Sequence, residues 1–143
     1  MLGIMEQFEL VTALTTEHKL ELHKLFQKEW WTLERSFEDM SSLLDHSLPV
    51  AFIHIPTNTL VAFLRVITDY RYFAFIMDVM VDEAYRRQNL GTKLVKSIFT
   101  LPELAQVKKF ELRCLPALES FYGNCGFTPT SRELLHLHHI RAK

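Results

Sequence analysis

The residues best suited to chemistry lie between positions 79 and 94, where an apolar strand pattern passes through a polar loop into a helix pattern. A helix begins with several backbone N–H groups that lack partners, and its dipole makes that end positive, so it can receive a phosphate. Gly91 has no Cβ to keep such a group away from the backbone, and Asn89 tolerates a left-handed turn. Three basic side chains add positive donors: Arg86, Arg87 and Lys93. The pattern indicates an anion site, and an ordinary basic loop before an amphipathic helix is the alternative interpretation.

A carboxylate precedes this loop. Asp78 is the one charged residue within the otherwise apolar run Tyr72–Val81, which is predicted to be a central strand. Burial disfavours the charged form of a carboxyl group and so makes it a better proton acceptor, which makes Asp78 a candidate general base. A hydrogen bond to neighbouring backbone or an ion pair with Arg65 is the alternative, and a chain of waters could carry the proton instead.

Two motifs in the correct order resemble the signatures of the GNAT superfamily of acyl-CoA-dependent N-acyltransferases. The first, R/Q-x-x-G-x-G/A between a strand and a helix, is matched by Arg86-x-x-Asn89-x-Gly91, with Asn89 in place of the first glycine. The second, [FL]-Y-x-x-x-G-F, is matched by the segment Phe121–Phe127. The resemblance extends roughly from residue 8 to residue 127. It is closest to a subgroup of small, stand-alone bacterial-type GNAT proteins whose substrates are mostly unassigned.

The resemblance implies that acetyl-CoA is the cosubstrate. In that family the pantetheine arm pairs with the exposed backbone edge of the fourth strand, and the pyrophosphate lies on the N–H groups of the following loop. Carried over to this sequence, the contacts with acetyl-CoA fall on Val79, Met80, Val81, Arg86, Arg87, Gln88, Asn89, Leu90, Gly91 and Thr92.

The resemblance also assigns roles in the reaction. Tyr122 stands where the family has the general acid that protonates the departing CoA thiolate, and the alternative is an aromatic residue whose hydroxyl caps a backbone group. A backbone N–H near Val79 would stabilise the oxyanion while the amine attacks directly. The acceptor pocket would include Trp31 and Arg35, with Trp30 and Asp39 nearby, and the alternative is a core aromatic pair beside a surface ion pair.

These assignments predict an N-acetyltransferase that moves an acetyl group from acetyl-CoA to a primary amine in a ternary complex. The acceptor would be a small molecule or a peptide, and its identity is left open by the sequence. The alternative is a non-catalytic acyl-CoA-binding sensor, which would keep the pyrophosphate loop and lack acceptor chemistry. The sequence leaves the oligomeric state open, and a homodimer is one option.

Composition narrows the class of protein further. The 143 residues include 16 Lys and Arg against 17 Asp and Glu, a formal net charge of −1, which speaks against a nucleic-acid partner. The apolar fraction of 48% suits one compact domain over residues 1–143. No apolar run approaches the roughly 20 residues that a membrane helix needs, and no secretory leader is evident, so the expected location is the cytoplasm.

The cysteines and histidines do not form a recognisable chemical site. Cys114 and Cys125 fit neither a disulfide framework nor a zinc-ligand spacing, and both are interpreted as small buried thiols. His136, His138 and His139 are close in sequence, but no nearby cysteine or carboxylate completes a metal site. No metal is therefore expected.

Periodicity, caps and breakers predict the elements that must position these residues. The resemblance implies an α/β (α+β) fold of the GNAT type, with a mixed, mostly antiparallel sheet of six to seven strands, about four helices, and a splay between strands four and five. Strands are expected at Phe8–Leu14, Pro49–Ile55, Leu60–Ile67, Tyr72–Val81, Val107–Cys114 and around Leu135 and Leu137. Helices are expected from Thr16 to the pair Trp30-Trp31, over Ser36–Asp45, over Leu90–Ile98 and over Ala117–Tyr122.

Overall fold

The computed structural model of the chain describes residues 4–131 and 133–142, and within them it has five strands and four α-helices. The strands are β1 (Phe8–Val11), β2 (Leu48–His54), β3 (Thr59–Thr68), β4 (Phe73–Val81) and β5 (Lys109–Leu112). The helices are α1 (Thr16–Phe26), α2 (Phe37–Asp45), α3 (Leu90–Ser97) and α4 (Glu119–Asn124). The elements follow the predicted order, from a first strand to a short helix near residue 120.

The strands form one mixed sheet in the order β1-β2-β3-β4-β5. The pairs β1–β2, β2–β3 and β3–β4 are antiparallel, whereas β5 runs parallel to β4. The register between β3 and β4 shifts between Phe63 and Arg65, because β4 carries an extra residue opposite this point. The β4–β5 ladder covers only Phe73–Ile76, so the second half of β4 has no partner on that side within the described residues.

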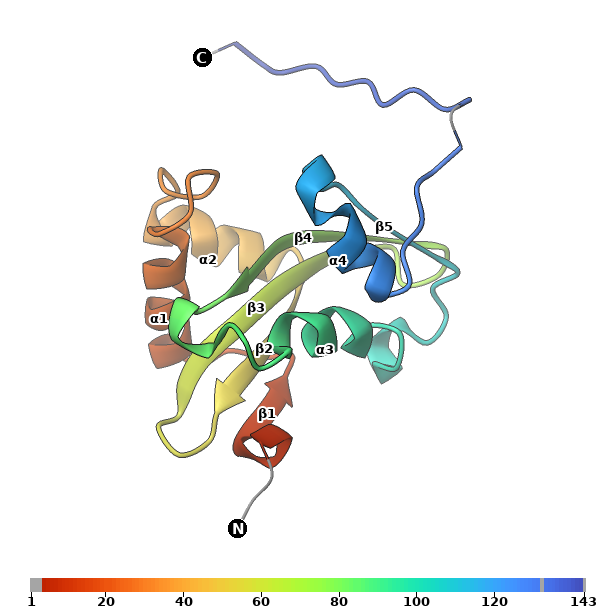
Figure 1. Ribbon diagram of the computed structural model, residues 1–143. Helices are drawn as coiled ribbons and strands as arrows, with labels where there is room; N and C mark the ends of the chain where they lie inside the picture. The colour runs from red at the N-terminus through yellow and green to blue at the C-terminus, as the bar shows by residue number, and fades with distance from the viewer. Residues whose placement is uncertain (1–3, 132, 143) are drawn as a thin grey trace.

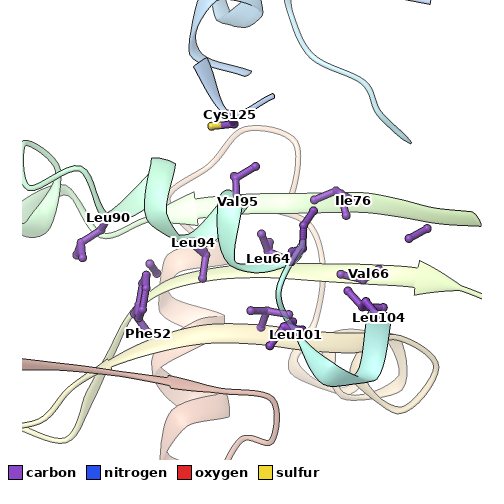
Figure 2. Close-up of a cluster of buried hydrophobic side chains, with 14 of the residues drawn as sticks. Phe52, Leu64, Val66, Ile76, Leu90, Leu94, Val95, Leu101, Leu104 and Cys125 are labelled. Atoms are coloured by element: carbon purple, nitrogen blue, oxygen red, sulfur yellow. The ribbon is translucent and has the colours of Figure 1, made fainter. Parts of the chain in front are cut away.

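The helices cover the two faces of the sheet (Figure 1). On one face, α3 places Leu90, Leu94 and Val95 against the strands, as Figure 2 shows, and Cys125 closes this cluster from the end of α4. On the other face, α1 and α2 pack a second apolar cluster against the sheet. The sheet is therefore buried on both sides near β3, which explains why that strand is apolar over most of its length.

The first helix ends earlier than the sequence pattern indicates. We expected it to reach Trp30-Trp31, but α1 stops at Phe26, and turns occupy the residues up to α2. The buried Thr32 hydroxyl donates a hydrogen bond to the Phe26 carbonyl oxygen at 2.8 Å, and the Glu29 N–H donates to the same oxygen at 3.4 Å, so this carbonyl at the helix end is satisfied without a further helical turn. Trp30 is consequently 76% exposed and does not belong to the core.

The expected final strand is absent from the described residues, and the sheet has five strands instead of six or seven. Leu135 and Leu137 alternate with histidines as a strand would, yet they are 81% and 80% exposed in a segment that leads away from the body of the protein (Figure 1). Alternating apolar and polar residues suit a strand at the surface of a sheet, but a strand forms only where a second strand lies beside it to pair with.

The two cysteines are unpaired and differ in environment. Cys125 is buried, as predicted, and burial raises the pKa of its thiol, which favours the protonated form. Cys114 is exposed, so its interpretation as a buried residue was wrong. None of the helices formed by the described residues is long and apolar enough to cross a membrane.

Candidate functional site

A groove of about 460 Å³ opens beside the unpaired half of β4. It is bounded by the end of β4, the loop that follows, the start of α3, the beginning of α4 and the connection between α1 and α2. Its lining residues are Glu29, Trp31, Val79, Met80, Val81, Arg86, Arg87, Asn89, Leu90, Gly91, Thr92, Leu118, Phe121 and Tyr122. Nine of the ten residues predicted to contact acetyl-CoA thus border one groove, and Gln88 lies between two of them in the chain.

The loop between β4 and α3 presents a row of unpaired backbone donors. Arg87 and Asn89 both adopt left-handed conformations, with φ of 55° and 61°. None of the backbone N–H groups from Arg87 to Thr92 has an acceptor within the described part of the chain. Asn89 therefore performs the conformational task for which glycine is the usual residue, and its own side chain does not cap α3.

Gly91, in the first motif, lies against Phe121 of the second motif. A Cβ atom at this position would lie 3.2 Å from Cζ of Phe121 and 3.5 Å from Cγ2 of Val81. The sequence suggested that the glycine is needed for the approach of a phosphate, whereas the structure gives it a packing reason as well. The missing Cβ lets the first turn of α3 lie directly against the aromatic residue that precedes Tyr122.

The side chain of Arg86 is fixed by two contacts within the protein. Its Nε donates to the Val81 carbonyl oxygen at 3.1 Å, and its Nη2 is paired with Oε1 of Glu29 at 3.2 Å. This bridge ties the α1–α2 connection to the loop across the groove. Sequence reasoning missed Glu29, because it belongs to no motif and becomes relevant only when α1 folds beside the end of β4.

Tyr122 faces the groove from α4. Its ring packs edge-on against Phe121, with 4.9 Å between the ring centroids. Desolvation by burial raises the pKa of the Tyr122 phenol to about 12, so the hydroxyl remains protonated throughout the neutral range. This hydroxyl has no hydrogen-bond partner among the described residues, and because no buried side-chain oxygen there is left unpaired, the hydroxyl must be accessible from the groove. Both facts argue against the alternative that it merely caps a backbone group.

Asp78 lies at the extra residue of β4 and has a left-handed backbone with φ of 56°. Its carboxylate is almost fully buried, and Oδ2 accepts from Arg65 Nε at 2.5 Å and from Arg35 Nη1 at 2.8 Å. The ion pair with Arg65 that the sequence left as an alternative is therefore present. Two guanidinium groups hold this carboxylate, which suits a positioning role better than proton transfer, and its assignment as a base stays a prediction.

Replacement of Asp78 by asparagine should lower the free energy of unfolding by about 2 kcal/mol, because two charge-assisted hydrogen bonds weaken. Asparagine tolerates the left-handed backbone as well as aspartate does, so the change isolates the charge. Urea denaturation followed by circular dichroism measures the effect. Asp39→Asn, on the exposed first turn of α2, should change stability by less than about 1 kcal/mol.

The predicted acceptor residues are separated by the fold. Trp31 lines the groove, whereas Arg35 lies in the ion cluster of Asp78, and its guanidinium carbon is 5.5 Å from the centroid of the Phe26 ring. Trp30 and Asp39 do not line the groove. Within residues 4–131 and 133–142, no group of three or more metal-ligating side chains gathers, and His136 instead contacts Arg113 at 3.2 Å.

Comparison with known proteins relates the chain to one family and one fold. The model of the Acetyltransferase (GNAT) family matches residues 11–127. A GNAT-family structure from Xanthomonas campestris pv. campestris superposes with a TM-score of 0.77 at 26% identity, covering 92% of this chain and 93% of that one. The glucosamine-6-phosphate N-acetyltransferase of Arabidopsis thaliana shares the fold, with a TM-score of 0.70 at 18% identity over 92% of this chain and 99% of the other.

A similarity in sequence covers a smaller region. A rice (Oryza sativa subsp. japonica) protein named "Probable glucosamine 6-phosphate N-acetyltransferase 2" is 36% identical over 52 residues. This match spans 36% of the present chain and 31% of the rice protein.

Proposed function

The chain belongs to the GNAT acetyltransferase family, and from this premise we propose that it transfers an acetyl group from acetyl-CoA to a primary amine. The observation that carries the proposal is the run of six backbone N–H groups, Arg87 to Thr92, that have no acceptor in the described part of the chain. Five of these six residues line the same groove as Tyr122. A binding site for an acidic cosubstrate and a protonated group suited to a leaving thiolate are thus combined in one cavity.

The groove fits acetyl-CoA in both its charged and its extended parts. The N–H groups at the start of α3, together with the helix dipole, suit a pyrophosphate. The free edge of β4 at Val79, Met80 and Val81 offers backbone donors and acceptors to the amides of a pantetheine arm. Arg86 supports this site indirectly, because it holds the Val81 carbonyl and Glu29 in place.

The proposed reaction uses few side chains. Acetyl-CoA supplies an activated thioester, and the acceptor amine attacks it directly in a ternary complex. A backbone N–H near Val79, beside the irregularity of β4, would stabilise the developing oxyanion, a contribution of about 3 kcal/mol in comparable sites. As the C–N bond forms and the C–S bond breaks, Tyr122 donates its proton to the departing sulfur, and the proton released by the amine returns through water to the phenolate. Two guanidinium groups hold Asp78, so we assign it the task of shaping this part of β4.

The alternative function is a non-catalytic sensor of acyl-CoA. Tyr122 favours an enzyme, because this half-buried, protonated phenol lines the groove and has no hydrogen-bond partner in the described chain. A sensor would bind acetyl-CoA and have no need for such a donor.

The proposal is tested with purified protein. Acetyl-CoA binding is measured by calorimetry, and CoA release is then followed with a thiol reagent in the presence of individual amines. The panel should hold amino sugars and their phosphates, amino acids, polyamines and peptides, with glucosamine 6-phosphate included because related proteins carry its name. Amine-dependent release supports the transferase. Tight binding without release by any amine supports the sensor, and no binding excludes both.

A further inference from the structure

The cluster around Asp78 has more positive than negative charge. One carboxylate faces two guanidinium groups, so Arg35, Arg65 and Asp78 together carry a net charge of +1. The side chains of Asp78 and Arg65 are only 3% and 7% exposed, whereas that of Arg35 is 27% exposed. A charge this far from water is costly unless an anion approaches it. The excess charge is therefore accessible at Arg35 alone.

We propose that the acceptor is an amine that carries a second, anionic group, a carboxylate or a phosphate, and that Arg35 binds this group. The inference rests on the proposed acetyltransferase function and specifies the substrate class for it.

Arg35 has the free donors that such a role requires. Within the described chain its guanidinium donates one hydrogen bond, from Nη1 to Asp78, although the group has five N–H donors. Contact with the Phe26 ring and the bond to Asp78 fix the plane of the guanidinium. A fixed guanidinium with unused donors is suited to bidentate binding of a carboxylate or phosphate.

The cluster adjoins the groove through the chain, although Arg35, Arg65 and Asp78 are not among the residues that line it. Asp78 immediately precedes Val79, and Trp31 lines the groove four residues before Arg35 in the same connection. Met80 belongs to the apolar cluster on the α1–α2 side of the sheet, as does Phe63, two residues before Arg65 in β3. Val79 and Val81 instead pack against the cluster on the α3 side. An anion at Arg35 would therefore not compete with the pyrophosphate at the start of α3.

Among the described residues, no carboxylate other than that of Asp78 forms an ion pair with Arg35 or Arg65. Glu29 is the one carboxylate among the residues that line the groove, and it is already paired with Arg86. A polycationic acceptor would meet repulsion at Arg35, while a neutral amine would leave the excess charge without a partner.

The test compares amines that differ only in a remote charged group. Glucosamine 6-phosphate is paired with glucosamine, and 4-aminobutanoate with 4-aminobutanamide, so that the two arms separate phosphate from carboxylate. We expect kcat/KM for the anionic member of at least one pair to be about tenfold higher, the usual value of one charge-assisted hydrogen bond. In Arg35→Met this advantage should disappear, mainly through KM, and Arg71→Met, on an exposed turn, should keep it.

The variant is expected to fold, because loss of Arg35 leaves Asp78 paired with Arg65. If the neutral amine of both pairs reacts as well as the anionic one, or if the preference survives in Arg35→Met, the inference is wrong while the acetyltransferase function stands. If no amine is acetylated, calorimetry measures whether the two anionic compounds bind to the CoA-loaded protein, for the wild type and for Arg35→Met. Binding that depends on Arg35 retains the ligand class and rejects the transferase, and absence of binding overturns the inference.

Discussion

Gly91→Glu should lower the affinity for acetyl-CoA by about 100-fold or more, which corresponds to at least about 2.7 kcal/mol of binding free energy. The new side chain would begin 3.2 Å from the Phe121 ring, on the wall of the groove. Its carboxylate would lie beside the unpaired N–H groups at the start of α3, where it would both occupy these donors and repel a pyrophosphate. Calorimetric titration with acetyl-CoA measures the loss directly.

Two further variants separate charge from packing. Gly123→Glu introduces the same charge on α4, where an added Cβ would meet no atom within 4 Å, so its affinity should stay close to that of the wild type. Gly91→Ala requires only a small shift of Phe121 and should reduce the affinity modestly. Unchanged affinity in Gly91→Glu, with a normal circular dichroism spectrum, would show that acetyl-CoA does not bind at this helix start.

Tyr122→Phe should reduce kcat by about 100-fold, the lower end of what a positioned proton donor contributes. The ring remains, so its packing against Phe121 is retained, and the dissociation constant of acetyl-CoA should not change. A thiol is a stronger acid than this phenol, so the phenol gives up its proton to the sulfur only as it recovers one from the attacking amine through water. Steady-state CoA release with a saturating acceptor gives kcat for both proteins.

The raised pKa of Tyr122, about 12, predicts the pH dependence of this effect. Because the folded protein holds the proton more tightly than a free phenol does, the donor stays protonated well above neutral pH. The ratio of the wild-type kcat to the variant kcat should therefore be constant between pH 7 and about pH 10, which is about two units below the pKa of Tyr122. A ratio that falls in this range, or an equal kcat in both proteins, would contradict the assignment of Tyr122 as proton donor.

Much of the candidate site could be predicted, because it is built from residues that are close in the sequence. The strand, loop and helix around Gly91 were evident from periodicity, and the left-handed conformation of Asn89 follows from the tolerance of asparagine for that region. The second motif was identified from the segment Phe121–Phe127. The contact between this segment and Gly91 was not predicted, since the two segments are far apart in the sequence.

The errors and omissions concern partners that are far away in the chain. Arg86 meets Glu29 across 57 positions, and Arg35 meets Asp78 across 43. The expected strand at Leu135 and Leu137 fails for a related reason, because its alternation is local while a ladder needs a second strand. The end of α1 depends on Thr32, which reaches back to the Phe26 carbonyl only after the connection has turned.

By itself, the sequence determined the order of the elements, the phosphate-type loop before α3 and the near balance of charge, since these depend on residue types and on neighbours within one or two turns. The tertiary structure alone decided that β4 keeps a free edge beyond Ile76, that Glu29 lines the groove, and that two arginines share one buried carboxylate. Such features depend on which distant segments pack together, and that choice is made by the burial of the whole core.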